Sequence, residues 1–96
     1  MDTLFILSKS PWARRDMDEW VGRVGPADGL LLIQDAVLAL RGAPERVSRG
    51  LRALEGRLFA LEADLAARGI DPGRASAVDE RGVVELIAGA QRVLAI

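Results

Sequence analysis

The feature that most constrains the fold is an unbroken apolar run, Leu30–Ile33, which follows a turn and stops at Gln34 and Asp35. The run does not alternate with polar residues, which is typical of a central strand of a parallel sheet that is covered on both faces. Parallel neighbours need crossover connections, usually helices. The run therefore predicts an α/β domain.

Other short apolar segments predict the remaining strands: Thr3–Leu7, Arg57–Leu61, Ser76–Val78 and Arg92–Ile96. The chain has 96 residues, enough for one domain with a modest core. We therefore expect a single domain over residues 1–96. Its mainly parallel sheet should have about four to five strands with helices on both faces, in a small three-layer arrangement.

Helical segments fall between these strands. Ser10 and Pro11 resemble an N-cap and a first helical position, which predicts a helix running to about Arg23. Asp35 is expected to cap a short helical turn. Later helices are predicted from Pro44 to near Gly56, over residues 62–69, and from Asp79 onward, where one face should dock on the sheet through Val83, Leu86, Ile87 and Ala90.

The absence of cysteine and histidine excludes several functions. It removes thiolate nucleophiles, persulfide carriers, Cys/His zinc sites and imidazole bases, so that carboxylate, hydroxyl and arginine chemistry remains. The 13 basic and 14 acidic residues nearly cancel, and no overall field gathers nucleic acid or an anionic membrane. We expect no catalytic residue, no metal and no cofactor.

The start of the chain does not resemble a secretory signal. Met1–Ser8 has an acidic residue at Asp2 and only a short apolar run. Nothing approaches the roughly 20 apolar residues that span a bilayer. Cytoplasmic location without membrane attachment is the expectation.

Three stretches, Leu4–Trp12, Gly29–Asp35 and Leu58–Gly69, resemble the DsrH/TusB family in order and spacing. The family pattern has a Ser-Pro-aromatic turn after the first strand, an acid after the leucine-rich second strand, and an acidic "DL-x-x-RG" helix after the third. The matching residues here are Ser10, Pro11, Trp12, Asp35, Asp64, Leu65, Arg68 and Gly69.

The resemblance implies a DsrE/F-like fold and a hexamer containing two copies each of this chain, a DsrE/TusD-like subunit and a DsrF/TusC-like subunit. Such complexes pass persulfide sulfur toward 2-thiolation of the wobble uridine in tRNA, or within sulfur oxidation. Some members have a cysteine at a place that aligns roughly with Trp20. Its absence here excludes a sulfur-carrying role for this chain and leaves a structural role. The chain also lacks the family's C-terminal aromatics.

The loop after the first strand and the end of the second supply candidate contacts. Ser8, Lys9 and Ser10 lie at a strand's carboxyl end, where α/β proteins often bind anions. A capped helix with a solvated lysine is the favoured interpretation, because no glycine-rich loop lets the backbone approach a phosphate closely. Asp35 stands where ligand-binding carboxylates often sit, although a helix cap is the simpler interpretation.

Tryptophan and arginine supply the other candidates. Trp12 and Trp20 are eight residues apart, which places them not far from one face of the predicted first helix. They are either partner anchors or core residues, since large aromatics are enriched in both places. Arg46, Arg49 and Arg52 either contact tRNA phosphates or an acidic partner, or form a solvated face whose charges pair with Glu45 and Glu55.

The sequence thus predicts a non-catalytic subunit of a sulfur-relay complex, with interface contacts among Lys9, Ser10, Trp12, Trp20, Asp35, Arg46 and Arg49. The alternative is a small-molecule or nucleotide-binding module that uses Ser8–Ser10 together with Asp35. In isolation the chain can also pair with itself.

Overall fold

The computed structural model describes all 96 residues and contains one five-stranded parallel sheet in the order β4-β3-β2-β1-β5. The apolar run predicted to be central forms β2, which lies between β1 and β3 and has all four residues buried. It spans Gly29–Leu32, one position earlier than predicted. The other strands are β1 Thr3–Leu7, β3 Leu58–Leu61, β4 Ser76–Val78 and β5 Arg92–Ala95.

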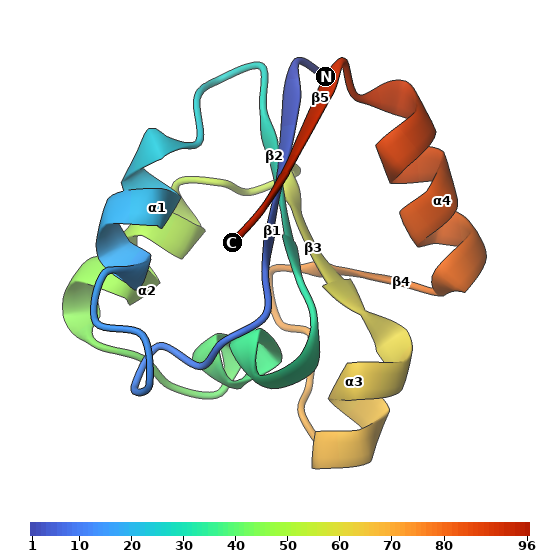
Figure 1. Cartoon of the computed structure of the whole chain (residues 1–96). Helices are drawn as coiled ribbons and strands as arrows, with labels where there is room; N and C mark the ends of the chain where they lie inside the picture. Colours follow the sequence, from blue (N-terminus) through green and yellow to red (C-terminus); the bar gives the residue numbers. More distant parts are fainter.

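The order of the strands decides which face each helix covers. Successive strands β1 to β4 step in one direction across the sheet, and right-handed crossovers then place their connections on one face. The step from β4 back to β5 runs the other way and places its helix on the opposite face. Figure 1 shows α1 and α2 on one side of the sheet and α4 on the other. The predicted α/β fold with helices on both faces is confirmed.

The helices are α1 Met17–Arg23, the 3₁₀ helix η1 Gln34–Leu40, α2 Glu45–Arg52, α3 Glu62–Arg68 and α4 Glu80–Gly89. Glycines with positive φ follow two of these helices. Gly69 ends α3 with φ 62°, and Gly56 closes the turn after α2 with φ 85°. Glycine adopts these angles without the steric penalty of a Cβ atom.

The core lies between the sheet and the α1/α2 layer, as one cluster of 18 buried residues. Leu7, Leu30 and Leu58 of the strands pack there with helix residues such as Val21 and Leu51. The two helices approach closely at Gly50, where an added Cβ would lie 2.6 Å from Val21 Cγ1. This contact explains why glycine occupies a helix interior in which it is otherwise unfavourable.

The opposite face is covered more thinly. Leu4 and Leu31 are fully buried there, yet α4 contains no buried residue. Val83, Leu86 and Ala90 of its predicted docking face are half-buried, whereas Ile87 is 42% exposed. The prediction was wrong for Ile87, because the apolar residues of α4 form two stripes and only one of them is partly covered.

The predicted start of the first helix was also wrong. Ser10 Oγ accepts a hydrogen bond from the backbone N–H of Ala13 at 3.0 Å, and its carbonyl oxygen accepts one from Arg14 N at 2.9 Å. These bonds close an isolated turn, and α1 begins only at Met17. A serine followed by proline favours a first helical turn, but it does not decide whether the helix continues.

Candidate functional site

The loop after β1 places one large aromatic side chain in solvent. Trp12 is 66% exposed and lies in the turn before α1. Lys9, in the same loop, is exposed, and the Ser10 hydroxyl accepts the hydrogen bond from Ala13 N described above. Trp12 therefore does not share a helix face with Trp20.

Trp20 has a different environment from Trp12. It is half-buried against the core, and its indole Nε1–H donates to Asp16 Oδ2 at 3.1 Å. The guanidinium of Arg23 lies 4.4 Å from the ring centroid and that of Arg14 lies 5.9 Å from it. The charged neighbours of Trp20 thus contact its ring directly, as cation–π partners.

Asp16 joins this cluster to the turn. Arg14 Nε donates to Asp16 Oδ1 at 2.6 Å, which, together with the Trp20 bond, lowers the pKa of the Asp16 carboxyl below its usual range. The same pair raises the pKa of Arg14. The charged forms of both groups are therefore favoured in the fold.

Asp35 does not cap the helix that follows it. Arg68 of α3 donates to Asp35 Oδ1 from Nη2 at 2.9 Å and from Nε at 3.2 Å, and η1 has no side-chain cap. Asp64 Oδ2 accepts from the backbone N–H of Gln34 at 2.6 Å. The cap prediction was wrong because the Asp35 carboxylate binds Arg68 instead. Arg68 is too distant in sequence for a local pattern to indicate this partner.

The arginines of α2 lie in solvent and pair loosely with acids. Arg46 Nη1 lies 4.0 Å from Asp18 Oδ2, and Arg49 Nε lies 4.0 Å from Glu45 Oε1. Glu45 also pairs with Arg52 at 3.0 Å. Glu55 pairs with Arg74 at 3.9 Å rather than with an α2 arginine. Exposed pairs of this kind contribute little to stability.

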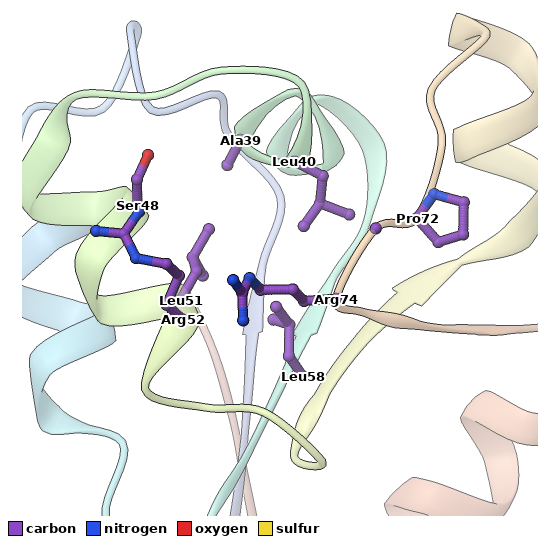
Figure 2. A pocket seen from close by; sticks show the side chains of 9 residues that line it. Ala39, Leu40, Ser48, Leu51, Arg52, Leu58, Pro72 and Arg74 are labelled. Atoms are coloured by element: carbon purple, nitrogen blue, oxygen red, sulfur yellow. The ribbon is translucent and has the colours of Figure 1, made fainter.

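Sequence reasoning missed a cavity of about 350 Å³ between α2, the end of η1 and the loop before β4 (Figure 2). Arg52 and Arg74 line it above apolar side chains, among them Leu51 and Leu58. Its residues come from four separate segments. The only local signal is that Ser48, Leu51 and Arg52 are spaced to share one side of a helix.

None of the four cavities of the structure is lined by Ser8, Lys9, Ser10 or Asp35. No group of three or more acidic, histidine or cysteine side chains is arranged to hold a metal ion. No helix is both long and apolar enough to cross a membrane.

Comparison with known proteins gives both a family and a fold. A family model described as "DsrH like protein" matches residues 9–93. The structure is similar to the crystal structure of the ychN protein from E. coli, with a TM-score of 0.70, 15% sequence identity and complete coverage of both chains. No curated protein matches the chain. At this identity the ychN likeness concerns the fold alone.

Proposed function

Because the chain belongs to the DsrH-like family, we propose that it is a non-catalytic subunit of a sulfur-relay complex. The observation that carries this proposal is the family match, which covers residues 9–93 and so includes every strand except the first one and the end of the last one. The three stretches that resemble DsrH/TusB proteins contain most of β1, all of β2 and β3, and the start of the connection that follows each strand.

The residue content of the chain supports a proposal in which a partner carries the sulfur. A persulfide needs a cysteine thiol, and this chain has none. The place at which some DsrH-type proteins have a cysteine aligns roughly with Trp20 by resemblance. The Trp20 ring is stacked by Arg23, and its indole nitrogen donates to Asp16. In this proposal the chain binds the partner that carries the sulfur and stabilises the complex.

The partners in this proposal are DsrE/TusD-like and DsrF/TusC-like subunits in a cytoplasmic heterohexamer. The relay would lead either to 2-thiolation of the tRNA wobble uridine or to sulfur oxidation. Arg46 and Arg49 do not form a purely cationic surface for RNA, because each lies near a carboxylate, Asp18 and Glu45 respectively. Any tRNA contact of this chain is therefore local.

Two exposed apolar regions support a partner-binding role. One is Trp12 in the loop after β1. The other is the edge strand β5, with Val93 and Leu94 each 42% exposed. On a separate element, Val84 in the outer stripe of α4 is 65% exposed. An edge strand offers unpaired backbone groups, and exposed aromatic residues are enriched at interfaces.

The test is co-expression of the chain with DsrE-like and DsrF-like partners from the same genome, followed by size exclusion with light scattering. A stable complex that contains all three chains is the expected result. Trp12→Ala should weaken the complex without lowering the melting temperature of the isolated chain, because Trp12 is 66% exposed. Glu62→Ala, a change of an exposed side chain in α3 outside both apolar regions, serves as the control. A chain that elutes alone beside its partners contradicts the proposal.

A further inference from the structure

The cavity beside α2 exists because the connection between β3 and β4 leaves part of the sheet uncovered. Its helix, α3, has only seven residues and contacts η1 at the end of the sheet. The chain returns to β4 through a loop, and Ala77 of β4 stays exposed although it pairs with buried Ala60. The space that a longer crossover helix would fill is therefore open, and the cavity lies there.

The floor of this cavity is apolar and rigid. Leu58 is 1% exposed and Leu51 is 5% exposed, and both belong to the main core. Ala39 and Leu40 at the end of η1 extend the apolar wall. A packed floor keeps its shape when a ligand enters, so little ordering is required on binding.

The rim of the cavity is cationic. Arg52 and Arg74 line it, and no acidic residue does. Figure 2 shows Arg74 extending from the loop before β4 toward α2, with Leu58 beneath it. Their partners, Glu45 and Glu55, lie outside the cavity, at 3.0 Å from Arg52 and 3.9 Å from Arg74. Such exposed pairs are weak, so an incoming anion can compete with them.

The loop that carries Arg74 is held in place. Gly73 N donates to Asp71 Oδ1 at 2.8 Å, and Ala75 N donates to the carbonyl oxygen of Pro72 at 2.9 Å. Ile70 and Ala75, on either side of the loop, are buried in the core. Arg74 is thus presented from a fixed backbone, which reduces the entropy lost when it binds an anion.

We propose that this cavity binds a small organic anion, with an apolar body on Leu51 and Leu58 and an acidic group on Arg52 and Arg74. Guanidinium groups match the geometry of carboxylate, phosphate and sulfonate oxygens. A volume of about 350 Å³ lies at the lower end of the range for small-molecule pockets. The site lies away from Ser8–Ser10 and Asp35 and does not depend on the proposed relay function.

The test uses 1-anilinonaphthalene-8-sulfonate, which has an apolar naphthalene and phenyl group and one sulfonate. The probe is titrated into the full chain, and its fluorescence reports binding. Saturable binding of one probe per chain is expected. Arg74→Gln and Arg52→Gln should each weaken it by about tenfold, the effect of losing one hydrogen-bonded charge partner. Arg49→Gln, which removes the same charge from the same helix outside the cavity, should leave binding unchanged.

Two further readouts locate the probe and test the role of charge. Backbone amide NMR signals of Ser48 and Gly73 should shift on titration, and those of Arg92 in β5 should not. The uncharged N-phenyl-1-naphthylamine should bind at least about tenfold more weakly than the sulfonate. Equal binding of both probes, or equal weakening by Arg49→Gln and Arg74→Gln, overturns the proposal, as does the absence of saturable binding.

Discussion

Arg68 donates two hydrogen bonds to one oxygen of Asp35, from Nη2 at 2.9 Å and from Nε at 3.2 Å, across 33 positions of sequence. The pair joins α3 to the start of η1 at the carboxyl end of β2. Arg68 also lies 3.6 Å from Asp64, whose other oxygen holds the backbone N–H of Gln34. The connections after β2 and β3 are therefore tied together by side chains rather than by the sheet.

The two acids of this cluster should differ in their effect on stability. Asp64→Ala removes the bond to Gln34, a non-glycine residue with φ 50° that needs local support, and should cost about 1–2 kcal/mol. Asp35→Ala removes a surface ion pair and should cost at most about 1 kcal/mol. Urea denaturation of both variants checks the order. A larger loss for Asp35→Ala would show that the ion pair, not the backbone bond, holds the junction.

The Asp16 cluster predicts an acid-sensitive signal from Trp20. Because the folded-state pKa of Asp16 is lowered, chiefly by the hydrogen bond from Arg14, the unfolded chain binds the proton more readily. The contribution of Asp16 is fully present above about pH 4 and is lost as pH falls through the lower folded-state value.

Thermal melts between pH 3 and 7 measure this effect, with tryptophan fluorescence as the readout for the indole. Asp16→Asn should reduce stability above about pH 4 and flatten its dependence on pH below that point. Asp18→Asn, which lacks the bond to Trp20, serves as the control. An unchanged pH profile in Asp16→Asn would contradict the assignment.

Local patterns were sufficient for most of the fold. The apolar run at Leu30 indicated the central strand, Ser76–Val78 forms β4 as predicted, and Asp79 begins α4 by accepting a hydrogen bond from Gly82 N at 2.8 Å. Each of these signals is complete within a few residues. Which strands pair with each other cannot be read from a local pattern. The position of β5 beside β1, for example, follows only from the topology of the whole sheet.

The site was harder to predict because its contacts are distant in sequence. Asp35 has the properties of a cap, and only the fold brings Arg68 to it. Trp12 and Trp20 have the spacing of one helix face, but the helix begins between them. The cavity at Arg52 and Arg74 depends on a missing helical cover, a property of the assembled sheet that no motif records.

Because α4 is packed only loosely on the sheet, we expect this helix to unfold locally more easily than the rest of the fold. It has no buried residue, whereas all residues of β2 are buried. Amide hydrogens in such a segment exchange through local unfolding. Hydrogen–deuterium exchange should be faster in Glu80–Gly89 than in Gly29–Leu32. Equal protection of both segments would show that α4 opens only with the whole domain.

Two glycines on the facing helices α1 and α2 should respond oppositely to the same substitution. In Gly50→Ala the new methyl group would lie 2.6 Å from Cγ1 of Val21, which is buried and β-branched and so has little freedom to move. The α1 and α2 helices would have to separate, at a cost of about 1–3 kcal/mol. Gly22→Ala meets no atom within 4 Å and should instead stabilise the fold by about 0.5–1 kcal/mol, because alanine favours helix. Denaturant melts of the two variants isolate the α1/α2 contact, since both add one methyl group to a helix. Equal effects in both would show that the helices are not held at the distance that Gly50 permits.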